Sequence, residues 1–110
     1  MRDDERVERW LEDLAGTLRR AADLAERGRD SYLADPALPL AFEALSNRVG
    51  DLAKRLRTAD PERFADPIWA QAARNRDFVV HHYDRMDADL LWRTVTISFV
   101  RLAQVVADEQ

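Results

Sequence analysis

The residue types best suited to chemistry are concentrated in one run of the chain, residues 74–85. This run holds both histidines of the chain, three arginines and one of its two tyrosines. If the run is helical, with about 100° of rotation per residue, Arg76 and Tyr83 lie on nearly the same face. Asp77 lies one turn before His81, so its carboxylate can meet the imidazole. The run therefore combines a cation for phosphate, a group that titrates near neutrality, a carboxylate to orient it and a phenol.

This set of groups suits cleavage of an RNA phosphodiester without a metal. His81 can take the 2′-OH proton or protonate the leaving oxygen, while Arg76 offsets charge on the phosphate. The two positions lie about 140° apart around a helix, and a long Arg side chain closes part of that gap. The ribose supplies the nucleophile, which fits a chain without cysteine. The structural alternative, in which these residues only close a helix end, is the more common one on spacing alone.

Other candidate residues favour structural roles. His82 is expected to be a surface or packing residue, and Trp69 and Trp92 are expected to be core or subunit-interface aromatics. Adjacent histidines lack the i, i+4 partner of a helical zinc site, so neither a metal nor a cofactor is expected. The sequence has no Gly-rich phosphate loop and no basic–aromatic stripe of a nucleic-acid platform. The acidic residues of the first helix are expected to form a solvated face: Asp3, Asp4, Glu5, Glu8, Glu12 and Asp13.

Four helical segments would have to position the run at 74–85. The first has an apolar stripe from Val7 through Ala22 to Ala25 and a stop at Gly28. The second opens at Asp35-Pro36, as an N-cap followed by proline, and its stripe ends at Leu56.

The third segment opens at Asp66-Pro67 and runs to about Tyr83, after a short turn at Asp60-Pro61. The fourth is capped by Asp87, and its stripe includes Leu91, Val95, Ser98, Leu102, Val105 and Val106. These segments predict an all-α chain, a single domain over residues 1–110 that forms an up-and-down four-helix bundle.

Composition supports one folded domain. The 110 residues are 46% hydrophobic and 35% charged with only 3 Gly, which excludes a disordered tail and a many-stranded β fold. No apolar stretch approaches about 18 residues, so we expect a soluble protein with no membrane partner. The absence of cysteine allows a cytoplasmic location, which is the one we expect. The formal net charge of −4 would repel nucleic acid, so any nucleic-acid role needs a local site.

The run Arg76–Tyr83 has the form Arg, four residues, His, one residue, Tyr. This motif resembles the signature of the HepT family, within the HEPN (higher eukaryotes and prokaryotes nucleotide-binding) superfamily. Its surroundings are also similar: Pro67-Ile68-Trp69 before the motif, and Asp87 and Leu90–Val95 after it. Upstream, Val49–Lys54 is similar to the family's Ile-Gly-Glu-Ala stretch, with Asp in place of Glu.

The resemblance implies the toxin half of a bacterial toxin–antitoxin system, a metal-independent ribonuclease. It implies Arg76 and His81 as the catalytic pair, in a homodimer whose motif helices face each other across one cleft. It also implies that Tyr83 is modified with AMP by MntA, a nucleotidyltransferase antitoxin, with which the chain could form a hetero-oligomer. The family often has Asn where this chain has Asp77, and Arg74 or Arg85 could compensate the added charge.

Asp77, Arg74 and Asn75 are thus expected to support or orient the catalytic pair. A two-fold axis beside the motif would supply a second His81, because acid–base cleavage needs two proton-transfer groups. Two alternatives remain open: a non-catalytic nucleotide- or RNA-binding helical module, and an interaction partner of a nucleotidyltransferase. Turnover separates the first from an enzyme, and growth effects of substitutions at Arg76 or His81 separate the second.

Overall fold

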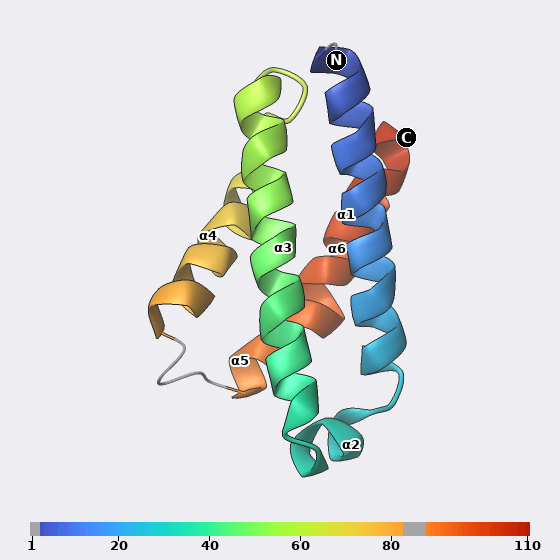
Figure 1. Ribbon diagram of the computed structural model, residues 1–110, viewed down its shortest axis with the longest axis vertical. Coiled ribbons are helices and arrows are strands. Elements are labelled where there is room, and N and C mark those ends of the chain that lie inside the picture. The colour runs from blue at the N-terminus through green and yellow to red at the C-terminus, as the bar shows by residue number, and fades with distance from the viewer. Residues whose placement is uncertain (1–2, 83–87) are drawn as a thin grey trace.

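A computed structural model describes the backbone of residues 3–82 and 88–110, and the side chains of residues 4–74 and 88–110. Every element in these ranges is helical. Figure 1 shows two long helices side by side, a third beside one of them, and a C-terminal segment running behind both. The all-α helical bundle expected from the sequence is confirmed. The elements are α1 (Asp3–Ala25), α2 (Arg29–Ala34), α3 (Ala37–Ala59), α4 (Pro67–His82), α5 (Ala88–Arg93), the π-helix η2 (Thr94–Ser98) and α6 (Phe99–Glu109).

Helix α1 separates an apolar side from a charged side. Leu11 and Leu14 are fully buried, whereas the acidic residues from Asp4 to Asp13 are exposed, as expected for a solvated face. Ala22, which was predicted in the apolar stripe, is exposed. Ala21 is the last fully buried residue of α1, and Leu24 and Ala25 after it are partly buried against the core. The predicted stop holds, because Gly28 adopts φ 91°, a left-handed conformation that glycine accepts without strain.

The short helix α2 was not predicted, because six residues are too few to show a helical period. It is fixed by Tyr32, which is 1% exposed. The Tyr32 hydroxyl donates to the backbone oxygen of Ala88 at 2.7 Å. Its ring lies 5.0 Å from the rings of both Phe42 and Trp92, measured between centroids. Tyr32 therefore ties α2 to α3 and to the start of α5. Trp92, predicted as a core or subunit-interface aromatic, is partly buried and packs against the core.

The predicted turn at Asp60-Pro61 is present. The Asp60 side chain accepts from the backbone N–H of Arg63 at 3.1 Å. The Arg63 guanidinium in turn donates to Glu109 at 2.7 Å and to Glu8 at 3.1 Å. The hydrogen bond to Glu109, followed by that to Glu8, raises the pKa of Arg63 above its usual value. Arg63 thus links this turn to the start of α1 and the end of α6.

The C-terminal segment departs from the predicted stripe at its π-helix. The backbone N–H of Phe99 donates to the carbonyl of Thr94, a five-residue step that inserts one extra residue into the helix. Thr96 also donates its hydroxyl to the carbonyl of Trp92 at 2.8 Å. The insertion moves Phe99, 5% exposed, into the core position that the sequence analysis gave to Ser98. The prediction of Ser98 as a stripe residue was therefore wrong.

By length and composition alone, the combined helix Ala88–Glu109 could cross a membrane, whereas the sequence analysis expected no such segment. In the structure, Leu91 and Val95 are buried, and the segment packs against α1 and α3. Packing within the bundle therefore explains the apolar inner face. Ile97 and Val100, in contrast, are exposed.

Candidate functional site

The first half of α4 is firmly anchored. The Asp66 side chain accepts from the backbone N–H of Ile68 at 2.9 Å, which caps the helix as the Asp66-Pro67 pair predicted. Trp69 is 1% exposed, and its ring meets Phe64 edge-on with centroids 4.9 Å apart. Trp69 is therefore the core aromatic that the sequence predicted. The cap and this aromatic contact fix where α4 starts and how it is rotated about its axis. They thereby set which side of its later turns faces α3.

The predicted catalytic positions lie on the last turns of this helix. Asn75, Arg76, Asp77 and His81 are in helical backbone, which continues to His82. Helical geometry separates positions 76 and 81 by about 7.5 Å along the axis and places positions 77 and 81 on adjacent turns of one side. The side chains of these residues lie outside the described ranges, so the Asp77–His81 contact stays a prediction.

Other residues predicted for the site lie just before and just after these positions in the sequence. Arg74, expected to support the catalytic pair, is exposed on α4. Tyr83, expected to carry AMP, lies outside the described residues, as do Arg85 and the predicted cap Asp87. Within the described part of the chain, no group of His, Asp and Glu could hold a metal ion. Because both histidines lie outside the residues searched, that finding leaves the predicted absence of a metal untested.

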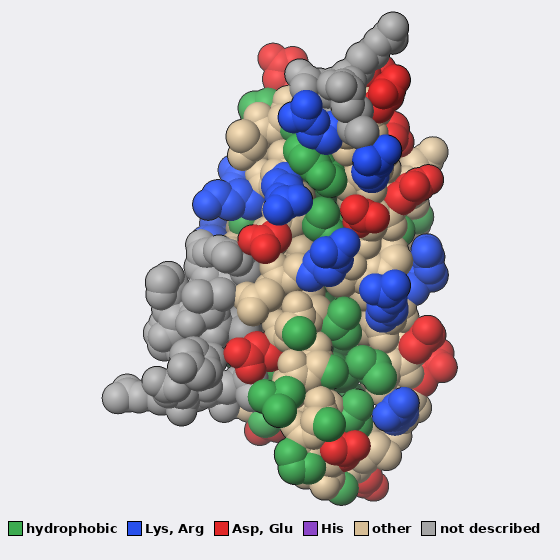
Figure 2. All heavy atoms as spheres, in the orientation of Figure 1, with side chains coloured by type: hydrophobic (Ala, Val, Ile, Leu, Met, Phe, Trp, Pro, Cys, Tyr) green, Lys and Arg blue, Asp and Glu red, His purple; other side chains and the backbone are tan. Residues whose placement is uncertain are grey.

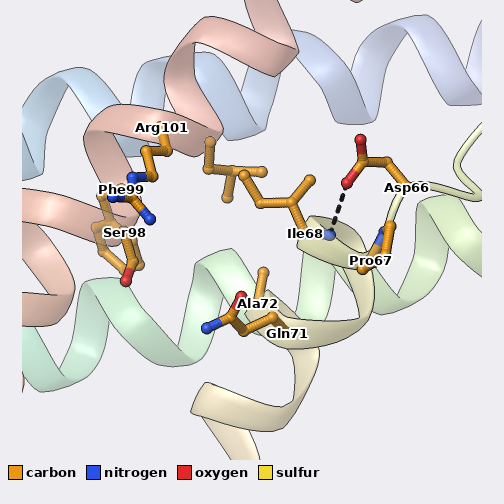
Figure 3. Close-up of a pocket in the computed structure, with 9 residues that line it drawn as sticks. Asp66, Pro67, Ile68, Gln71, Ala72, Ser98, Phe99 and Arg101 are labelled. Atoms are coloured by element: carbon orange, nitrogen blue, oxygen red, sulfur yellow. Dashed lines mark hydrogen bonds between the residues drawn. The ribbon is translucent and has the colours of Figure 1, made fainter.

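The structure adds a crevice that sequence reasoning missed. It has a volume of about 290 Å³ and lies between the start of α4 and the end of η2 with α6. Figure 3 shows Ser98 and Arg101 at one end of the crevice and Asp66 at the other. Apolar side chains, including Ile68 and Ala72, line the space between them. The crevice could bind a small apolar group, with the polar side chains at its ends forming a rim.

The π-helix forms part of one wall of the crevice. Ser98, its last residue, is half-buried, Phe99 after it is buried, and both line the crevice. The only sequence signal was Thr94-Val95-Thr96-Ile97, a β-branched run inside an apparent helix, which is unfavourable for regular helix geometry. The crevice adjoins Asp66–Ala72, at the end of α4 away from the predicted catalytic positions.

Comparison with known families identifies the relationship. A family model described as Ribonuclease HepT-like matches residues 14–108. The chain belongs to the HepT-like ribonuclease family. The HepT-like match covers all of α3 and α4, including the Arg76–Tyr83 motif, and nearly all of the C-terminal segment. No curated protein and no solved structure matches the chain. The resemblance inferred from the motif and its surroundings is therefore confirmed at the level of the HepT-like family.

Proposed function

We propose that this HepT-like chain is the toxin of a bacterial toxin–antitoxin system and acts in the cytoplasm as a metal-independent endoribonuclease. The observation that supports the proposal most is the match to a ribonuclease family over residues 14–108. The matched region includes an Arg, a His and a Tyr, at positions 76, 81 and 83, with the spacing of the family's signature. General acid–base catalysis needs residues of these types on a fixed element, and α4 carries positions 76 and 81.

The proposed reaction uses the RNA itself as nucleophile. His81 takes the proton of a ribose 2′-OH, and the resulting oxygen attacks the adjacent phosphorus. The bond from phosphorus to the 5′-oxygen breaks, and a second acid returns a proton to that oxygen. The products are a 2′,3′-cyclic phosphate and a 5′-OH. The reaction therefore consumes no water and needs no metal ion. Arg76 stabilises the charge that builds on the phosphate oxygens.

A homodimer would supply the second acid. One α4 carries one Arg76 and one His81, whereas two copies related by a two-fold axis provide a pair of each. The outer side of the C-terminal segment offers apolar area for such an association, because Leu90, Ile97 and Val100 are 37%, 47% and 60% exposed. Light scattering should give a dimer mass for the chain, and a monomer mass would contradict this part of the proposal.

The antitoxin is proposed to be an MntA-like nucleotidyltransferase that transfers AMP from ATP to the Tyr83 hydroxyl. The added phosphate places negative charge and bulk on the residue two positions after His81, which would repel RNA. We expect Tyr83→Phe to remain toxic in cells that also express the antitoxin, because the acceptor oxygen is gone. Cell growth measures the toxicity, and intact mass measures the addition of AMP. A Tyr83→Phe chain that still gains AMP would exclude Tyr83 as the target.

The catalytic claim is tested by cleavage of an RNA in the presence of a chelator. The chain, Arg76→Ala and His81→Ala are compared, and the cleaved ends are analysed for cyclic phosphate. We expect the unmodified chain to cleave the RNA without metal and both variants to lose this activity. Binding without cleavage would instead favour a non-catalytic RNA-binding module, and full activity of His81→Ala would contradict the assigned role of His81.

A further inference from the structure

A basic groove lies between α1 and α3. Arg6 and Trp10 line it from α1, and Asp51, Lys54 and Arg55 line it from α3, around a volume of about 470 Å³. We call it the α1–α3 groove. It combines three cations with one carboxylate, so its charge is opposite in sign to the net charge of −4 of the chain. Figure 2 shows several Lys and Arg side chains, with Asp and Glu side chains between them, on the upper and middle parts of the face that α1 and α3 form.

The groove also presents an aromatic surface. Trp10 is half-buried, packs against the core and lines the groove with the rest of its side chain. The Arg6 guanidinium carbon lies 6.0 Å from the centroid of the Trp10 ring. Proteins that bind single-stranded nucleic acid combine cations that follow the phosphates with aromatic rings on which bases stack. Arg6, Trp10, Lys54 and Arg55 supply both kinds of group.

The cations of the groove differ from the arginines that hold the fold together. The ion pairs shown between described residues involve Arg29, Arg48 and Arg63. Lys54 and Arg55, in contrast, are exposed on α3 and face the volume of the groove. Their charges are therefore available to an anionic ligand at little cost to the fold.

Helix α3 connects the groove to the helix that carries the motif. It packs against α1, with which it forms the groove, and also against α4. A strand of RNA that crosses α3 could therefore reach both regions. The sequence shows no basic–aromatic stripe because these cations lie on two helices that are distant in the sequence.

We propose that the α1–α3 groove binds the sugar–phosphate backbone of single-stranded RNA, with one base stacked on Trp10. Lys54 and Arg55 contact phosphates, and Arg6 holds the indole and faces a neighbouring phosphate. This inference rests on the proposed ribonuclease function and adds a place, outside the catalytic positions, that holds the substrate. It also answers the objection that an acidic protein repels RNA.

The test is fluorescence anisotropy with a labelled single-stranded 2′-O-methyl RNA, which the proposed reaction cannot cleave because its 2′-oxygen is blocked. The double variant Lys54→Ala/Arg55→Ala is compared with Arg19→Ala/Arg27→Ala. The control removes the same charge from exposed residues, beginning about 20 Å along α1 from Arg6. Loss of two phosphate contacts should weaken binding by about 10-fold or more and reduce the slope of log K against log salt by about 1.4.

Trp10 is tested by two substitutions that keep an apolar side chain. Trp10→Leu removes the stacking surface and should weaken binding by about 5-fold or more, whereas Trp10→Phe should retain most of the affinity. Circular dichroism establishes that both variants are folded. Equal affinities for Trp10→Leu and Trp10→Phe would contradict the proposed stacking.

The outcomes separate this inference from the proposed function. If the chain cleaves RNA but the groove variant binds like the unmodified chain, the inference is wrong and the ribonuclease function stands. If the chain binds through the groove but cleaves no RNA, the inference stands and the ribonuclease function is wrong. An equal loss in the Arg19→Ala/Arg27→Ala control would overturn the inference, because net charge alone would then explain binding. Equally tight binding of a glutamate-rich peptide would overturn it too, by pointing to an acidic protein partner.

Discussion

The end of α4 and the α1–α3 groove obtain their residues in different ways. The motif on α4 lies within the eight residues Arg76–Tyr83, so helical geometry alone sets the relative positions of its helical part. The groove joins Arg6 on α1 to Lys54 on α3, and only the packing of these helices brings them together. We therefore expect the motif to govern chemistry and the groove to govern affinity, with different sensitivity to changes in the core.

The largest effect is expected at the motif. Replacement of His81 by Ala should lower the rate of RNA cleavage by roughly 10²–10⁴-fold, because a proton-transfer group is lost. The matched control is His82→Ala, which removes the other histidine and should leave the rate nearly unchanged. The cleavage rates of both variants are measured in the presence of a chelator. An equal loss of rate in both would contradict the assignment of a catalytic role to His81 and not to His82.

A core substitution should act on the fold as a whole. Leu56 is fully buried on α3, and its change to Ala should lower the free energy of unfolding by about 2–5 kcal/mol. Leu40, on the same helix but 63% exposed, should lose less than about 0.5 kcal/mol on the same change. Urea denaturation measures both. At a temperature where Leu56→Ala is folded, its cleavage rate should match that of the unmodified chain, and a selective loss of cleavage would contradict the assigned structural role.

The start of α4 offers a smaller test of how the motif is positioned. Asp66→Ala removes the side-chain acceptor for the N–H of Ile68 and should cost about 1 kcal/mol of stability. Glu62→Ala, an exposed change in the preceding turn, is the control and should cost less than about 0.5 kcal/mol. Thermal denaturation can compare the two, and equal melting temperatures would show that the cap contributes nothing.

The smallest effect is expected at Arg63, which belongs neither to the motif on α4 nor to the α1–α3 groove. Arg63→Gln removes the contacts to Glu109 and Glu8 and should cost at most about 1 kcal/mol, since these groups are partly exposed. Because the pKa of Arg63 is raised in the folded protein, its stabilising contribution is complete below the ordinary pKa of arginine and is lost only as the pH rises through the raised one. Titration of Arg63 should therefore add no slope to stability between about pH 6 and 9. Denaturation across that range checks this, and a loss of stability toward pH 9 that is absent in Arg63→Gln would contradict it.

Periodic and local features were predictable from the sequence. The four helical segments, the Asp66 cap and the burial of Trp69 follow from spacing and capping chemistry, and the structure confirms them, whereas the apolar stripes hold apart from Ala22 and Ser98 among the described side chains. The short helix α2 and the π-helix η2 were missed, because the first is too short for a period and the second changes the period within one helix. The inward turn of Phe99 in place of Ser98 is a consequence of that change.

The same division applies to the functional regions. The motif was recognisable because its Arg, His and Tyr are close in the sequence. The crevice at Asp66 and the α1–α3 groove were not, because each is formed by two elements whose contact is a property of the tertiary fold. In the sequence alone, Trp10 belongs to an apolar stripe, and only the packing of α1 on α3 shows that part of its side chain lines a basic groove.

The most direct test of the central claim is the single-turnover rate of RNA cleavage as a function of protein concentration, for His81→Ala and Lys54→Ala/Arg55→Ala. We predict that His81→Ala lowers the maximal rate and leaves the half-saturating concentration unchanged. We predict the reverse for the groove variant, whose half-saturating concentration should rise by about 10-fold at an unchanged maximal rate. A fall in maximal rate for the groove variant, or an unchanged maximal rate for His81→Ala, would contradict the separation of chemistry on α4 from RNA binding between α1 and α3.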